Sequence, residues 1–185
     1  MSTLDLFTRA AATFGDRLAA VGDWSGSTPC PDWDVRALTN HVAGELLWMP
    51  DLVDDKTVAE VGDKFDGDLL GDDPVATFHR ATAEALASLS APGALERTVH
   101  LSFGDFSGAD YADQVASDLV IHSWDLARAV GADESLDPDL VALASRVFGP
   151  VFDAFRGPGG FGTDVPVADD ADAQTKLLAK SGRAV

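Results

Sequence analysis

Two stretches of the chain place side chains that can bind a metal on apolar, helix-like patterns. His41 ends the stretch TPCPDWDVRALTNH (residues 28–41), and Asp118 and His122 lie in SDLVIHSWDLAR (residues 117–128). Imidazole nitrogen and carboxylate oxygen are ligands that divalent first-row metals favour. Asp118 and His122 are four residues apart, so on a helix they point in nearly the same direction and can reach one ion. The spacing also fits an ordinary helix-surface pair, and it does not show that His41 meets the other two.

Other polar and aromatic side chains are weaker candidates. His79 is a fallback ligand, and His100 alternates with apolar residues, which predicts exposure to solvent. Glu45 follows His41 by one helical turn, so it is a candidate ligand, second-layer partner or general base, with a plain helix-face position as the alternative. Trp48 follows by two turns and is a candidate wall for a bound cofactor, with core packing as the alternative.

Three further residues have simple structural interpretations. Cys30 stands between two prolines with no histidine or basic neighbour in sequence, which favours a rigid, packed loop over a nucleophile. Asp125 and Arg128 are three residues apart and are predicted to pair on the helix surface. The sequence has no Gly-rich phosphate loop, serine nucleophile elbow or paired-cysteine metal motif.

Composition limits the class of protein. The chain has 185 residues, 46% of them hydrophobic, and a net charge of -18. One domain with a substantial core is therefore expected, and binding to nucleic acid or to an anionic membrane is not. The single cysteine, the lack of a signal-peptide pattern and the lack of a long apolar run predict a soluble, cytoplasmic protein.

The segments that carry the candidate metal ligands have helical patterns. Apolar residues recur at intervals of three and four in six stretches, and this periodicity predicts a mainly α-helical up-down bundle. The first three predicted helices cover residues 3–22, a stretch that is capped by Asp32 or Asp34 and can end or kink at Pro50, and a stretch from Pro74 to just before Pro92. The fourth and fifth cover residues 108–130 and residues 137–155, the latter with a bend or break at Gly149-Pro150. The last is a short helix that is capped by Asp170 and ends before Gly182.

Two regions depart from the helical pattern. Residues 97–106 alternate with period two, which predicts a short strand or hairpin that turns at Gly104-Asp105. Residues 54–73 are acidic and are predicted to form a long connection, and residues 157–167 are predicted to form a Gly/Pro-rich crossing.

The two chemistry-bearing stretches together resemble a known family. Residues 28–41 are similar to the TPCPGW opening, followed by VRDL and a histidine, of actinobacterial mycothiol-dependent maleylpyruvate isomerase-like proteins, which belong to the DinB/YfiT-like metalloenzymes. Residues 118–131 resemble the second metal motif of that family, and residues 161–183 resemble the tail of its small single-domain branch. The resemblance implies a DinB-like four-helix bundle with a C-terminal extension, often dimeric, with His41, Asp118 and His122 as metal ligands.

The resemblance also implies the chemistry. The acid of this family is often Glu, and Asp118 is one methylene shorter, so its carboxylate must approach the metal more closely or bind through water. The full isomerases carry a C-terminal substrate domain for which this chain has no room, so maleylpyruvate isomerisation is not carried over. We expect a divalent metal, zinc first and nickel or another metal as the alternative, and mycothiol as the thiol in a transferase or isomerase acting on a small electrophile. The alternatives are a non-catalytic metal- or ligand-binding bundle and a hydrolase that uses metal-bound hydroxide.

Overall fold

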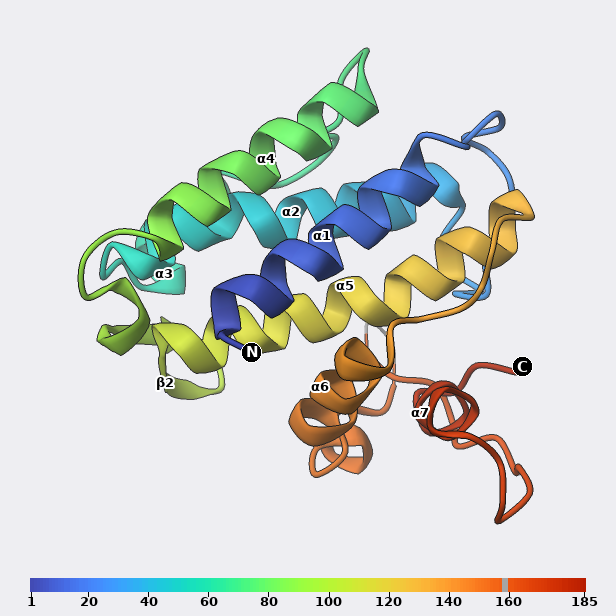
Figure 1. Cartoon of the computed structure of the whole chain (residues 1–185). Helices are drawn as coiled ribbons and strands as arrows, with labels where there is room; N and C mark the ends of the chain where they lie inside the picture. The colour runs from blue at the N-terminus through green and yellow to red at the C-terminus, as the bar shows by residue number, and fades with distance from the viewer. Residues whose placement is uncertain (158–159) are drawn as a thin grey trace.

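Four long helices form the body of this computed structural model, which describes residues 1–157 and 160–185. They are α1 (Thr3–Leu18), α2 (Val35–Val53), α4 (Pro74–Leu89) and α5 (Gly108–Val130). Helix α1 packs on α5 and α4, and α2 packs on the same two helices, which closes the bundle (Figure 1). The mainly helical fold predicted from the apolar periodicity is confirmed. None of the described helices combines the length and the apolar character that crossing a bilayer requires.

Smaller elements complete the fold. They are the short helix α3 (Val58–Val61), the 3-10 turn η1 (Ala94–Glu96), strands β1 (Thr98–Leu101) and β2 (Gly104–Ser107), helix α6 (Pro138–Phe148), the 3-10 turn η2 (Phe152–Phe155) and helix α7 (Ala173–Lys180). Helix α6 packs on α5, and α7 packs on α6, on the side of α5 away from α4 (Figure 1). The C-terminal part of the chain therefore covers a face of α5 that the bundle leaves open.

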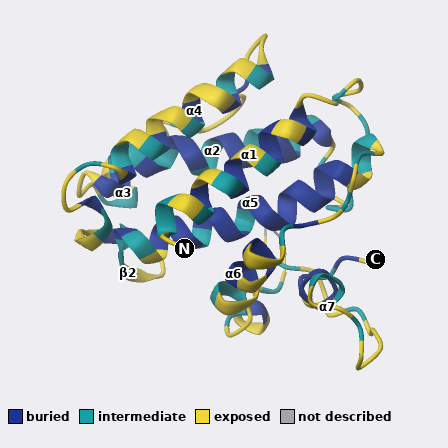
Figure 2. Cartoon of the chain, in the orientation of Figure 1, coloured by how far each residue is buried: buried dark blue, intermediate teal, exposed yellow. Residues whose placement is uncertain are grey.

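Helix α5 is the element that positions the site. One side of it packs on α1 and α2, and the other packs on α6, so residues 119–127 are all buried (Figure 2). The side chain of Ser107 caps its first turn by accepting a hydrogen bond from the Asp110 N–H, and Gly131 ends it with φ 68°. Since this half of α5 has no solvent face, the ionisable side chains of His122 and Asp125 depend on partners inside the protein.

Three helices differ in how well their ends agree with the prediction. The carboxylate of Asp34, one of two predicted caps, accepts the Ala37 N–H at 2.8 Å, and α2 continues through Pro50 to Val53. The first helix was predicted to reach Gly22, but it ends at Leu18, because the N–H groups of Ala20 and Val21 bond three residues back and tighten the chain. The predicted interruption at Gly149-Pro150 is confirmed: α6 ends at Phe148, and η2 follows as a separate turn.

Two predictions in the shorter elements are wrong. The hairpin turns at Ser102 and Phe103 and not at Gly104-Asp105, because Val99 pairs with Phe106 and Leu101 with Gly104. The cap of α7 is Asp172 and not Asp170, which lies in a preceding turn closed by Ala171 and Ala168. The predicted connection 54–73 contains α3, and the predicted crossing 157–167 includes residues 158 and 159, which lie outside the described residues.

Candidate metal centre

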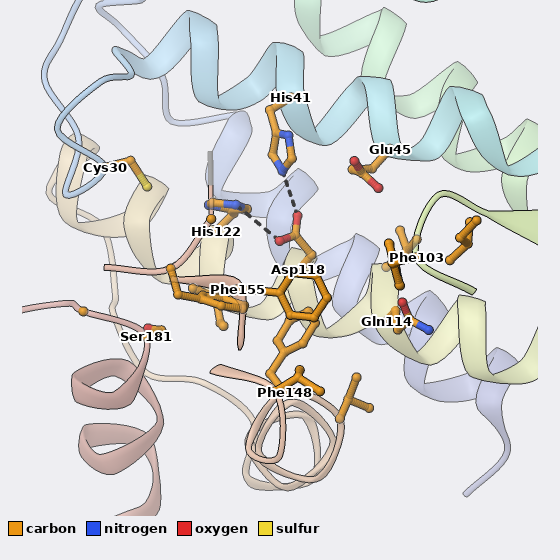
Figure 3. A pocket seen from close by; sticks show the side chains of 18 of the residues that line it. Cys30, His41, Glu45, Phe103, Gln114, Asp118, His122, Phe148, Phe155 and Ser181 are labelled. Atoms are coloured by element: carbon orange, nitrogen blue, oxygen red, sulfur yellow. Dashed lines mark hydrogen bonds and ion pairs between the residues drawn. The ribbon is translucent and has the colours of Figure 1, made fainter. Parts of the chain in front are cut away.

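The three predicted ligands meet between α2 and α5. His41 comes from α2, and Asp118 and His122 come from α5, one turn apart (Figure 3). Nε2 of His41 lies 3.1 Å from Oδ2 of Asp118, and Nε2 of His122 lies 3.4 Å from Oδ1 of the same carboxylate. The two imidazole rings are 5.1 Å apart between centroids and inclined by 77°. Helix packing thus joins residues that are 77 positions apart in sequence.

The donor atoms fit a single divalent ion. One donor from each of His41, Asp118 and His122 lies within 4.8 Å of the other two. Two imidazole nitrogens and one carboxylate oxygen form a donor set found in catalytic metal sites, where further coordination positions stay free for water or substrate. Both oxygens of Asp118 already approach an imidazole, so the shorter side chain does not keep this acid away from the histidines.

The local charges favour ionised groups at this centre. Burial opposes ionisation of Asp118, but the charges of His122 and then His41 outweigh burial and hold the pKa of Asp118 well below its usual range. Burial lowers the pKa of His122, but Asp118 and then Asp125 outweigh this effect and raise the pKa well above its usual value. A cation at this centre would replace a proton that the cluster otherwise favours, so metal binding is expected to release protons.

Asp125 supports His122 from behind. Its Oδ2 lies 2.9 Å from Nδ1 of His122, and its carboxylate accepts hydrogen bonds from Arg183 Nε at 3.1 Å and Nη2 at 2.8 Å. Burial raises the pKa of Asp125, but the hydrogen bond from His122 and the charge of Arg183 lower it to about 2. An acid on Nδ1 favours a proton there, and Nε2 is then free for a metal.

The predicted surface pair of Asp125 and Arg128 is wrong. Asp125 is completely buried, and Arg128 is exposed and pairs with Glu134 at 2.8 Å. The reason is that Asp125 lies three residues after His122 on a helix that is covered all round at this level. The same spacing from His122 was the signal in the sequence that could have identified Asp125 as its partner.

Cys30 joins this inner network. Its Sγ lies 3.3 Å from Oδ2 of Asp125 and 3.3 Å from Nη2 of Arg183. The predicted loop position is observed, but a basic group that is remote in sequence lies beside the thiol. Cys30, His122 and Asp125 also form a second group of possible metal donors within 4.8 Å. Because the guanidinium of Arg183 already bonds to both Cys30 and Asp125, we interpret this second group as a charge network and not as a cation site.

Trp33 is a site residue that the sequence reasoning missed. Its ring stacks on His41 at 4.7 Å with an interplanar angle of 28°, and it lies 5.6 Å from the ring of His122. The loop is fixed because the hydroxyl of Thr28 donates to the backbone carbonyl of Trp33 at 2.8 Å and accepts from the Cys30 N–H at 3.1 Å. The position of Trp33 just before Asp34, which caps the helix that carries His41, was the signal in the sequence that could have identified it.

A cavity of about 890 Å³ opens beside the three donors. Glu45 and Trp48 line it from α2, and the ring of Trp48 lies 5.9 Å from Phe65. Glu45 points into this cavity near Asp118 (Figure 3). Burial, and then the charge of Asp118, raise the pKa of Glu45. The cavity therefore has one wall on which a carboxyl group can hold a proton.

The other two histidines lie elsewhere. His79 packs beside Phe78 at 5.6 Å between ring centroids, and neither it nor His100 lines the cavity. The side chain of His100 is 34% exposed, in keeping with the predicted contact with solvent, and its Nδ1 lies 2.8 Å from the exposed Asp105 and its Nε2 3.5 Å from the exposed Asp55. Within the described chain, both fall outside the groups of three converging donors.

Comparison with known proteins gives this geometry a context. Residues 7–127 match the family model described as mycothiol maleylpyruvate isomerase N-terminal domain, a range that includes all three donors and Asp125. Two proteins of Mycobacterium tuberculosis, from strains CDC 1551 / Oshkosh and ATCC 25618 / H37Rv and both described as uncharacterized, are 30% identical over 192 residues, with 100% of each chain covered. No solved structure gave a significant match.

Proposed function

This chain belongs to the mycothiol maleylpyruvate isomerase N-terminal domain family, and we propose that it binds one divalent metal through His41, Asp118 and His122. We further propose that it uses this metal with a low-molecular-weight thiol to transform a small electrophile. The observation that carries the proposal is the convergence of three donors within 4.8 Å at the wall of a large cavity. Zinc is the metal we expect from two nitrogens and one oxygen, with nickel as the alternative, and mycothiol is the thiol that the family suggests.

Each residue has a role in this proposal. His41, Asp118 and His122 would hold the metal, which would supply a Lewis acid that favours the thiolate form of a thiol. Asp125 holds Nδ1 of His122, so that Nε2 faces the centre, and Trp33 fixes the plane of His41 by stacking on it. Glu45 holds or accepts a proton at its carboxyl oxygen on the cavity wall, which its raised pKa supports. Trp48 provides an aromatic surface for the thiol cofactor.

The proposal also covers the domain organisation, the location and the oligomeric state of the protein. We assign these roles to one bundle domain that covers residues 1–185, since the residues that build the cavity and its supports extend from Pro29 to Arg183. Thiol-dependent chemistry requires a reducing compartment, so we propose a cytoplasmic location. The homodimer expected for this type of bundle stays a prediction, which sedimentation analysis would check.

Metal analysis of protein purified without a histidine tag tests the proposal. We expect about one metal ion per chain, loss of the metal in His122→Ala, and normal metal content in His79→Ala, a matched histidine outside the cavity. Wild-type protein without stoichiometric metal, or unchanged metal in His122→Ala, would contradict the site. The thiol is tested by adding mycothiol to cobalt-substituted protein, where we expect a thiolate-to-cobalt absorption band. Turnover that needs no thiol would favour a hydrolase instead.

A further inference from the structure

One part of the cavity is lined by aromatic rings from two segments that are far apart in sequence. We call it the aromatic lobe and define it by five phenylalanines: Phe103, Phe106, Phe148, Phe155 and Phe161. Phe103 and Phe106 come from the hairpin β1–β2 and its turn, and the other three come from α6, η2 and the segment after them. The rings of Phe103 and Phe155 meet at 5.5 Å with an interplanar angle of 72°, which joins the two segments.

The lobe has an unusual amount of exposed aromatic surface. Phe103 is 54% exposed and Phe155 is 42% exposed, and these are the exposed phenylalanines of the described chain. Behind them, Phe148 and Phe161 pack edge to face at 5.1 Å, which gives the lobe an ordered wall. Exposed aromatic rings that border a concave surface mark a ligand site more often than they stabilise a fold.

The lobe and the metal donors share one cavity. Along α5 the cavity is lined by Tyr111, Gln114, Asp118 and His122, which are spaced by three and four residues and so lie on one face of the helix. Gln114 is one helical turn, roughly 5 Å, from Asp118. A molecule whose reactive carbon lies at the donors can therefore extend along this face of α5 and place its other end among the phenylalanines (Figure 3).

The charges along this path do not suit an anionic ligand. Asp32, Asp110 and Asp113 are acidic residues that line the cavity in addition to Asp118, and Glu45 adds a carboxyl group whose raised pKa favours its neutral form. The two lining arginines are already paired: Arg146 donates to Asp113 at 2.8 Å, and Arg183 donates to Asp125 at 2.8 Å. A carboxylate placed in the lobe would lose its hydration and meet aromatic rings and like charges, with no unpaired arginine or lysine among the described residues that line the cavity.

We propose that the aromatic lobe binds the uncharged aromatic or hydrocarbon body of an electrophilic carbonyl compound, so that this chain acts on a neutral, apolar substrate and not on a dicarboxylate. Maleylpyruvate, which gives the family its name, is a dicarboxylate, so the lobe makes this chain differ from the namesake in substrate. The inference rests on the proposed function for the position of the reactive carbon, but the selectivity of the lobe is a property of its own residues.

Unreactive ketones test the lobe without thiol or turnover. The probes are 4-phenylbutan-2-one, its analogue with a carboxylate at the para position of the ring, and butan-2-one, which lacks the ring. Isothermal titration calorimetry is done on the full chain, as purified with its metal and again after chelation. We expect 4-phenylbutan-2-one to bind at least about tenfold more tightly than either of the other two ketones. Phe103→Ala and Phe155→Ala should each weaken its binding roughly three- to tenfold.

Val167→Ala is the matched control, since Val167 is 38% exposed in the C-terminal segment and does not line the cavity. Its affinity for the probe should equal that of the wild type. The inference is overturned if the para-carboxylate binds as well as the neutral ketone, or if the two phenylalanine variants bind like Val167→Ala. Metal content measured on the same samples separates the two proposals. Protein that contains no metal as purified but still selects the neutral ketone supports the lobe and contradicts the metal site. Protein that contains metal as purified but shows no selectivity contradicts the lobe and leaves the metal site standing.

Discussion

The guanidinium of Arg183 forms two hydrogen bonds with the carboxylate of Asp125, at 3.1 Å to Oδ1 and 2.8 Å to Oδ2. Both side chains are buried, and Asp125 in turn contacts Nδ1 of His122. The segment that follows α7 is thereby tied to the helix that carries two of the three candidate ligands. Metal affinity and stability should therefore both depend on this link and on the backbone that allows it.

The first prediction concerns metal affinity. Asp125→Asn keeps the shape of the side chain but removes the charge that orients His122, so we expect metal affinity to fall about 10- to 100-fold. Competition with a chromophoric chelator measures this change. Arg128→Gln is the control, because Arg128 is exposed and pairs with Glu134, and its affinity should equal that of the wild type. Equal affinities in wild type and Asp125→Asn would remove Asp125 from the site.

The second prediction concerns stability. Arg183→Met removes the cation from a buried pair and leaves the charge of Asp125 and the thiol of Cys30 with one partner fewer. We expect the free energy of unfolding to fall by roughly 3 kcal/mol, as urea denaturation of the metal-free protein would show. Arg80→Met is the control, since Arg80 pairs with Glu84 at 3.2 Å and both side chains are about half exposed, at 55% and 47%, so its loss should be within about 1 kcal/mol.

The third prediction concerns acid. The pKa of Asp125 is about 2 in the folded protein and near 3.8 otherwise, so its ionised form stabilises the fold. Because the folded value is the lower one, this contribution is complete above about pH 4 and is lost as the pH falls toward 2; it amounts to about 2–3 kcal/mol.

The check compares wild type with Asp125→Asn in urea at several pH values on metal-free protein. The wild type should be the more stable at pH 5, and the difference between the two should shrink between pH 4 and pH 2. A difference that stays constant over this range would show that the ionisation of Asp125 does not contribute to stability.

The fourth prediction concerns the backbone beside Arg183. Gly182 has φ 89°, and a Cβ added to it would lie 2.5 Å from the Cα of Gly162. Gly182→Ala therefore forces the two segments apart, and we expect a loss of roughly 2 kcal/mol in stability together with weaker metal binding. Gly22→Ala is the matched control, because nothing lies within 4 Å of its added Cβ. Thermal denaturation and the chelator assay give both values.

The sequence was sufficient for the parts of the site that lie on one helix. The spacing of Asp118 and His122 predicted a shared face, and the apolar stripes predicted the helices that bring His41 to them. The contact between α2 and α5 depends on the packing of the whole bundle. Only the family resemblance could therefore predict that His41 lies beside Asp118 and His122. Arg183 was out of reach for the same reason, since its partner lies 58 residues away.

The errors had a different cause. The predicted pair of Asp125 and Arg128 requires Asp125 to lie on a solvent-exposed face of α5. Helix α6 and the C-terminal segment cover the face on which Asp125 lies. Turn propensity favours Gly104-Asp105 for the hairpin turn, but the register that pairs Val99 with Phe106 places the turn at Ser102 and Phe103. In both cases tertiary contacts decided between local arrangements that the sequence alone permits.

Three of the five phenylalanines of the aromatic lobe lie in a part of the chain that is separate from the three donors. The donors lie on α2 and α5, inside the range that matches the family model, whereas Phe148, Phe155 and Phe161 lie after it. Ligand preference can therefore diverge among relatives through changes in these later residues, while the helices that carry the three donors stay the same. In a chimera that takes residues 148–157 from a relative, we expect the choice of ketone to change and the metal affinity to remain that of the parent.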